Sequence, residues 1–205
     1  METTAAVLFP ARPVLADLIR PDLLRSVAVR NAVLVTAGAV LLAVASQIRI
    51  PLGFTPVPIN GGTFAVMVIG AALGASRGGA AVALYLMAGM IGIPVYAGAS
   101  GGVEVAFGAT GGYLLGYFVA AVLIGAAAER GADRRVRSAI PAMLVGSVVI
   151  YTLGASWLAV SVGVPLFGWT DSAWSMGVAP FLAGDAVKLV LAGLALPATW
   201  RLVRR

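Results

Sequence analysis

Two charged side chains stand three residues apart in a stretch that is otherwise apolar, FLAGDAVKLVLAGLALPA at residues 181–198. They are Asp185 and Lys188, and Lys188 is the sole lysine among the 14 basic residues of the chain. A spacing of three residues puts both side chains on one face of a helix. A charge at membrane depth costs about 2.5–3.5 kcal/mol on insertion scales, so it normally faces the bundle interior or a wet cavity. We therefore expect Asp185 and Lys188 to line a cavity.

The chemistry that this pair offers is recognition of a polar ligand. An ammonium group can pair with a ligand carboxylate, and a carboxylate can accept N–H groups from a ureido or amide group. A lysine, in a chain that otherwise uses arginine, supplies a point charge on a flexible stem, which suits a confined pocket. The alternative is an ion pair that neutralises itself and locks the packing of helices. The pair alone does not decide between these two roles.

The composition excludes most enzyme chemistry. The chain has no cysteine and no histidine, which rules out disulfides, thiolate or imidazole metal sites and nucleophiles activated by histidine. No phosphate-binding glycine loop is present in the sequence. The sequence therefore predicts a protein that is not an enzyme, without a resident cofactor or metal ion.

The fold class follows from hydrophobicity. The chain is 60% hydrophobic and 11% charged, whereas a soluble domain carries about a quarter charged residues. This predicts an all-α, polytopic membrane protein with six transmembrane helices. Four of the apolar runs reach the length of about 17–20 residues that spans a bilayer, and two shorter runs meet at a turn around Ser76 and Arg77. The six runs are 31–48, 62–75, 78–93, 110–128, 139–163 and 180–200.

The arginines predict the orientation. In a six-helix arrangement 12 of them fall on one side, and Arg49 alone falls on the other. Short cytoplasmic loops concentrate Lys and Arg, so both termini are expected in the cytoplasm. The predicted organisation is a cytoplasmic segment at 1–30, a transmembrane domain at 31–200 and a basic cytoplasmic end at 201–205. The net charge of +6 then reflects orientation in a bilayer, not binding to nucleic acid.

The connections on the other side, at about 49–61, 94–109 and 164–179, are long, nearly uncharged and rich in glycine, proline and aromatic residues. Such loops could cover a ligand, although Trp169 and Trp174 could equally form an interfacial aromatic belt. In the first helix, Ala39 and Ala43 form a strip of small side chains that lets helices approach closely in lipid. This strip predicts either packing within the bundle or a docking face for another membrane protein.

Three stretches resemble the BioY family, the biotin-specific substrate-binding (S) components of energy-coupling-factor (ECF) vitamin transporters. They are IPLGFTPVPINGGTFAV at 50–66, LYLMAGMIGIPVYAGASGGVEVAFGATGGYLLGY at 84–117 and FLAGDAVKLVLAGLA at 181–195. The first stretch departs from the family pattern, because Asn60, Gly61 and Gly62 stand where Thr-Leu-Gln is usual. Asn60 or Thr63 could take the place of that glutamine. Ala109 also replaces a proline of the second stretch.

The resemblance implies that the protein captures biotin from outside the cell and sits as a multi-pass protein in the cell (inner) membrane. The implied partners are a transmembrane coupling subunit, which would contact the Ala39 and Ala43 face, and two cytoplasmic ATPase subunits. We assign the ureido group of biotin to Asp185 and its carboxylate to Lys188. Phe54 and Trp169 are candidates for contact with the fused rings. The other expected ligand-binding residues are Gly184, Tyr96, Thr110, Gly111, Gly112, Tyr113 and Asn60.

A different class of function stays open at this point. The chain could be a channel or a proton-coupled secondary transporter for biotin or another small vitamin, with Asp185 as the proton carrier and no partner subunits. That alternative predicts uptake by the chain alone, dependent on a pH gradient. The S-component interpretation predicts binding without concentrative transport until the ATPases are present.

Overall fold

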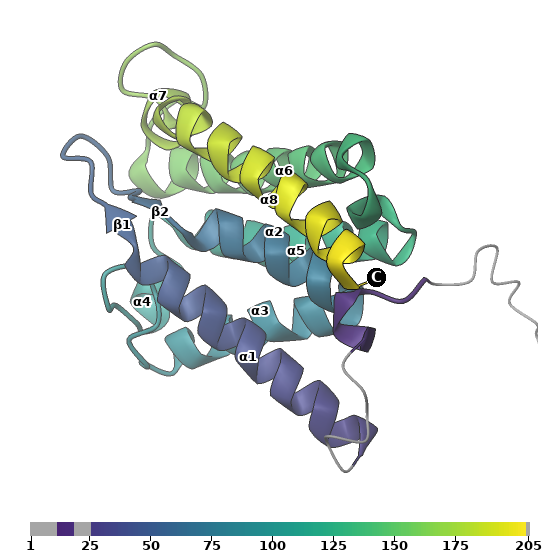
Figure 1. Cartoon of the computed structure of the whole chain (residues 1–205). Coiled ribbons are helices and arrows are strands. Elements are labelled where there is room, and N and C mark those ends of the chain that lie inside the picture. Colours follow the sequence, from purple (N-terminus) through teal and green to yellow (C-terminus); the bar gives the residue numbers. More distant parts are fainter. Residues whose placement is uncertain (1–11, 19–25, 204–205) are drawn as a thin grey trace, which may run out of the picture.

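The computed structural model describes residues 12–18 and 26–203, and within them six helices of 12 residues or more form one bundle (Figure 1). These helices correspond in order to the six apolar runs of the sequence. Four are long and apolar enough to cross a membrane, namely α1, α5, α6 and the segment Ala173–Val203 that contains α8. The helices are α1 (Val27–Gln47), α2 (Gly62–Leu73), α3 (Ala75–Met90), α5 (Gly111–Glu129), α6 (Val136–Val162) and α8 (Leu182–Val203).

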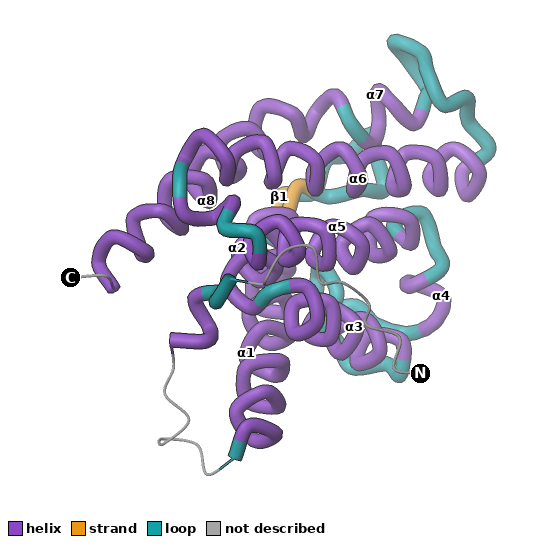
Figure 2. Tube along the Cα trace, turned by 90° about the vertical axis from the view of Figure 1, so that its right-hand side faces the viewer, coloured by secondary structure: helices purple, strands orange, loops and turns teal. Residues whose placement is uncertain are grey.

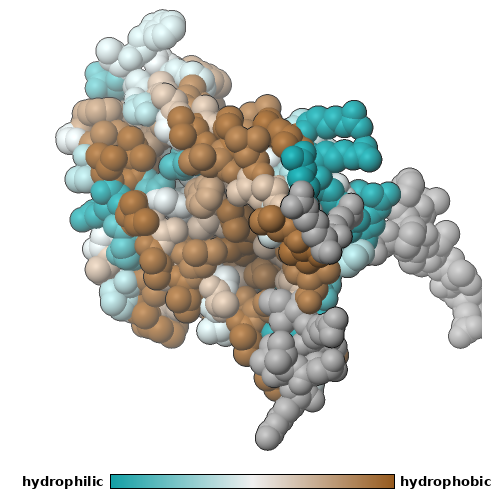
Figure 3. All heavy atoms as spheres, in the orientation of Figure 1, coloured by the Kyte–Doolittle hydropathy of each residue, from teal (hydrophilic) through white to brown (hydrophobic). Residues whose placement is uncertain are grey.

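The two ends of the bundle differ in character. One end, which we call the hairpin end, carries the antiparallel strands β1 (Arg49–Ile50) and β2 (Ile59–Asn60) and the short helices α4 (Val103–Ala106), α7 (Ala173–Gly177) and η4 (Ala179–Phe181). The opposite end, the arginine end, holds the turns η1 (Leu15–Leu18) and η3 (Ala132–Arg134) and the first turns of α3 and α6. Apolar residues cover much of the side of the bundle between these ends (Figure 3).

The turn between α2 and α3 lies earlier than the sequence predicted. Gly74 has φ +84° and ends α2, a conformation that glycine adopts without steric cost. The Glu129 carboxylate accepts a hydrogen bond of 2.8 Å from the Ala75 backbone N–H, so α3 begins at Ala75 instead of Gly78. The expected loop position of Arg77 was therefore wrong: Arg77 lies in the first turn of α3 and forms an ion pair of 2.7 Å with Asp17.

The helix α2 is short for a membrane span. Its 12 residues extend about 18 Å at the helical rise, against about 30 Å for the hydrocarbon core of a bilayer. Glycines allow it and α5 to pack closely. A Cβ atom added at Gly70 would lie 2.7 Å from the Ala121 carbonyl oxygen of α5, and one at Gly116 would lie 2.8 Å from the Ile150 Cα of α6. Small residues thus hold α2, α5 and α6 together, as in other membrane bundles.

Candidate ligand-binding site

A cavity of about 210 Å³ lies at the hairpin end of the bundle. The helices α2, α3, α5, α6 and α8 contribute to its wall together with the β1–β2 hairpin and the loop after α3. Its lining combines apolar groups with many hydroxyl, amide and charged groups that converge from distant parts of the sequence. The polar and aromatic lining residues are Ser46, Arg49, Asn60, Thr63, Tyr85, Tyr96, Ser100, Thr110, Tyr113, Tyr117, Tyr151, Phe181, Asp185 and Lys188.

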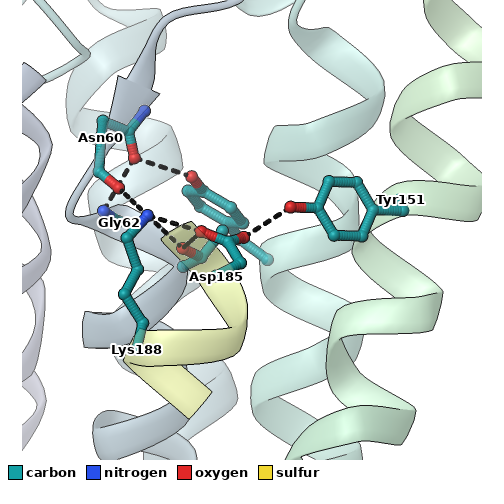
Figure 4. A network of polar contacts seen from close by, with 7 residues as sticks. Asn60, Gly62, Tyr151, Asp185 and Lys188 are labelled. Atoms are coloured by element: carbon teal, nitrogen blue, oxygen red, sulfur yellow. Dashed lines mark hydrogen bonds and ion pairs between the residues drawn. The ribbon is translucent and has the colours of Figure 1, made fainter. Parts of the chain in front are cut away.

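Lys188 is held by three protein acceptors in this cavity wall (Figure 4). Its Nζ lies 2.6 Å from the Asp185 Oδ1 atom, 2.7 Å from the Asn60 carbonyl oxygen and 3.3 Å from the Thr63 hydroxyl. An ammonium group has three N–H donors and no acceptor. All three donors of Lys188 are therefore directed at protein atoms.

Asp185 is the centre of the same network. Its Oδ1 accepts the Thr63 hydroxyl at 3.2 Å in addition to Lys188, and its Oδ2 accepts the Tyr151 hydroxyl at 2.7 Å. The side chain is 8% exposed, against 20% for the side chain of Lys188. Charge pairing and hydrogen bonds offset the cost of burying this carboxylate. Because a carboxylate has about four lone-pair sites, Asp185 retains the capacity to accept one further N–H from a ligand.

Asn60 connects this network to the β1–β2 hairpin. Its Oδ1 accepts the Gly62 backbone N–H at 2.8 Å and the Tyr117 hydroxyl at 3.2 Å. Its backbone carbonyl is the acceptor of Lys188 described above. The side-chain amide N–H groups donate to no atom of the described residues, so they are available to a ligand acceptor.

The loop after α3 forms another part of the wall and is attached to the end of α1. The Gln47 Nε2 atom donates to the Val95 and Tyr96 carbonyl oxygens at 3.1 and 3.2 Å, and its Oε1 accepts the Ala99 N–H at 2.9 Å. Ala99 has φ +54°, a conformation uncommon for a residue other than glycine. Gln47 thus braces a loop segment whose backbone geometry is itself unfavourable.

Tyr96 attaches the same loop to α3. Its hydroxyl donates to the Leu86 carbonyl at 2.7 Å, and its ring meets the Tyr85 ring edge-on with centroids 5.4 Å apart. Burial raises the pKa of the Tyr96 hydroxyl above its ordinary value, so this group stays a neutral donor. The rings of these tyrosines offer an apolar surface to the cavity.

The structure brings seven of the residues suggested by the sequence to the cavity wall: Asp185, Lys188, Asn60, Thr63, Tyr96, Thr110 and Tyr113. Ligand contact by each of them stays a prediction. The other candidates lie elsewhere in the described residues. Gly111 and Gly112 pack against Trp157 of α6, and Gly184 has open space beside it.

The two aromatic candidates also lie away from the cavity. Phe54 is 61% exposed and Trp169 is 95% exposed, and Trp169 belongs to the loop that projects beside α7 (Figure 2). Neither ring lines the cavity. Contact with the ligand would therefore require movement of these loops.

The predicted docking strip on α1 lies partly inside the bundle. Ala39 is 8% exposed, and Ala43 is half-buried against the core. The neighbouring residues Val40 and Val44 are 55% and 59% exposed. The outward surface next to the strip is thus apolar, and docking of a partner on it stays a prediction.

Several cavity residues were not predicted from the sequence. Tyr151 and Tyr117 lie inside apolar helices, where a buried phenol normally needs a hydrogen-bond partner, and that requirement was an available signal. Tyr117 also follows Tyr113 by four residues and so shares its helix face. Arg49 was noted for its isolation from the other arginines, but its place in the cavity wall depends on a hairpin that the sequence did not reveal.

Comparison with known proteins gives consistent similarities. The family model described as "BioY family" matches residues 19–205. A biotin transporter BioY of Rhodobacter capsulatus is 39% identical over 177 residues, which cover 80% of this chain and 90% of the relative. A biotin transporter BioY of Rhizobium etli is 36% identical over 163 residues, which cover 76% and 84% of the two chains.

A solved structure is similar over most of its length. It is described as the S-component for biotin from an ECF-type ABC transporter. The match has a TM-score of 0.75 and 26% sequence identity, and it covers 85% of this chain and 92% of that chain.

Proposed function

The chain belongs to the BioY family, and we propose that it captures biotin in the hairpin-end cavity as the substrate-binding component of an ECF transporter. It is a multi-pass membrane protein and a biotin transporter component by family. The observation that carries the proposal is the Asp185, Lys188 and Asn60 network in the cavity wall.

The chemistry of biotin suits this network. Its ureido group presents one carbonyl acceptor and two N–H donors in a plane. Asp185 can accept a ureido N–H with its remaining acceptor capacity, and the amide group of Asn60 can donate to the ureido oxygen. Tyr85, Tyr96 and Tyr113 supply apolar faces for the fused rings. The role of Lys188 in this arrangement is to orient and neutralise Asp185.

We further propose six membrane spans with both termini in the cytoplasm, in the cell (inner) membrane. The distribution of arginines supports this orientation, since short cytoplasmic loops concentrate basic residues. Biotin would then enter from outside at the hairpin end. Two cytoplasmic ATPase subunits would supply the energy by hydrolysing ATP. A transmembrane coupling subunit, docked along α1 near Ala39 and Ala43, would transmit it to this chain.

The test is equilibrium binding of labelled biotin to the purified chain, followed by uptake in proteoliposomes. We expect saturable binding by the chain alone and concentrative uptake only after the coupling subunit and ATPases are included with ATP. Uptake by the chain alone, driven by a pH gradient, would instead support the secondary-transporter alternative. Absence of biotin binding would reject the proposed function.

A further inference from the structure

One cation in the cavity wall has no acidic partner among the residues that the structure describes. Arg49 lines the cavity, and it forms no ion pair with any residue that the structure describes. The pairs found there are Arg77 with Asp17 and Lys188 with Asp185. The Arg49 guanidinium is therefore available to an anion that enters the cavity.

The hairpin directs this side chain toward the cavity. Arg49 and Asn60 are direct partners in the antiparallel β1–β2 register, and directly opposite residues project to the same face. Asn60 lines the cavity on that face. Arg49 therefore projects toward the same space as the amide group of Asn60.

The guanidinium of Arg49 packs closely against Gly98, which has no side chain. A Cβ atom added at Gly98 would lie 2.5 Å from the Arg49 Cζ atom and 2.6 and 2.8 Å from its two terminal nitrogens. The guanidinium thus rests against the loop backbone between Ala97 and Ser100, two residues that also line the cavity. A side chain at position 98 would displace it.

The charges of the cavity point to a monoanionic ligand. Asp185 and Lys188 neutralise each other, and Arg49 leaves one positive charge in excess. Lys188 already directs its three N–H groups at protein acceptors. A guanidinium has five N–H donors and can bind a carboxylate through two parallel hydrogen bonds.

We propose that Arg49 binds the ligand carboxylate, so that the cavity recognises a monocarboxylate with its ureido end at Asp185 and its acid end at Arg49. This inference rests on the proposed function, because it assumes that biotin is the ligand. It replaces the assignment of the carboxylate to Lys188 that the sequence suggested.

The experiment compares biotin with its primary carboxamide, which lacks the negative charge. Equilibrium binding of labelled biotin, and competition by the amide, are measured on the full chain in detergent. We expect the unmodified protein to prefer biotin by roughly tenfold, as for one charge-assisted contact at a partly exposed site. Arg49→Gln should weaken biotin binding by the same factor, leave amide binding unchanged and so abolish the preference.

Arg137→Gln is the matched control, because it removes the same charge from an exposed position at the arginine end. It should leave the affinities for both ligands unchanged. Equal losses of biotin and amide in Arg49→Gln would overturn the proposal, since Arg49 would then serve the fold alone. The proposal would also be overturned if the preference for biotin over its amide disappeared in Lys188→Met but persisted in Arg49→Gln. If the unmodified protein binds neither ligand, the proposed function itself fails.

Discussion

The ammonium of Lys188 and the carboxylate of Asp185 depend on each other, and this dependence decides how their removal should act. Each is mostly buried, and each has its partner within hydrogen-bond distance. Removing one partner leaves the other charge without its counter-charge in a poorly solvated place. Removing both leaves no uncompensated charge.

We therefore predict that Asp185→Asn and Lys188→Met each lower the stability of the purified protein by about 1–3 kcal/mol. The double variant should recover part of that loss. Thermal unfolding in detergent measures the effect. Additive losses in the double variant would contradict the coupling. Asp185→Asn should also reduce biotin affinity by about tenfold or more while the protein still inserts in the membrane.

At the scale of single residues, the sequence was informative where a residue type was out of place. Asp185 and Lys188 stood out because charges are rare in an apolar helix, and both line the cavity. Tyr117 and Tyr151 did not stand out, because a tyrosine in an apolar helix is compatible with simple packing. Their role depends on which hydroxyl meets Asp185 and Asn60, and tertiary structure decides that.

At the scale of elements, the attachment of the loop after α3 is the feature with the clearest functional consequence. Gln47 at the end of α1 makes three hydrogen bonds to the segment 95–99, which contributes to the cavity wall. Tyr96 anchors the middle of this segment in the hydrophobic core, whereas Ala99 at its end is exposed and keeps an uncommon backbone conformation. The retention of a ligand should therefore depend on Gln47.

We predict that Gln47→Ala speeds dissociation of biotin by about tenfold or more, because it removes three hydrogen bonds to the loop that contribute about 0.5–1.5 kcal/mol each. A chase experiment with unlabelled biotin measures the dissociation rate. Thr36→Ala is a suitable control, since Thr36 is an exposed polar residue of the same helix, away from the loop. An unchanged dissociation rate in Gln47→Ala would show that the loop does not restrain the ligand.

The contact between α5 and the turn after α2 gives a second prediction at this scale. A Cβ atom at Gly125 would collide with the backbone of Gly74 and Ala75, whereas one at Gly184 would meet no atom within 4 Å. Gly125→Ala should destabilise the protein by about 1–3 kcal/mol through overpacking. Gly184→Ala should leave it unchanged or add up to about 1 kcal/mol, since alanine favours a helix. Equal unfolding temperatures of the two variants would contradict the close packing at Gly125.

The apolar runs predicted the six helices well, because burial in lipid or core demands continuous hydrophobicity. They did not predict β1 and β2, whose two-residue strands are too short to show alternation. The start of α3 was also misplaced. It depends on Gly74 and on a hydrogen bond from Ala75 to Glu129, which lies 54 residues away in the sequence.

At the scale of the whole molecule, the cavity forms where elements that are far apart in the sequence come together. Its wall takes Asn60 from the hairpin, Tyr151 from α6 and Asp185 from α8. No local pattern in the sequence carries that arrangement. Family resemblance indicated the ligand, and the structure adds which groups meet at the site.

Because the arginines are distributed unevenly, cleavage by a protease can report the orientation of the protein in the membrane. Trypsin cleaves after Arg and Lys, and outside the helices Arg49 is the one such residue described at the hairpin end. In right-side-out vesicles, trypsin should cut only after Arg49, and bound biotin should slow this cut. In inside-out vesicles, cleavage should occur at several arginines and be insensitive to biotin. The masses of the fragments identify the cleavage sites in both kinds of vesicle. Cleavage at several arginines in right-side-out vesicles would show that the topology is the reverse of the one proposed.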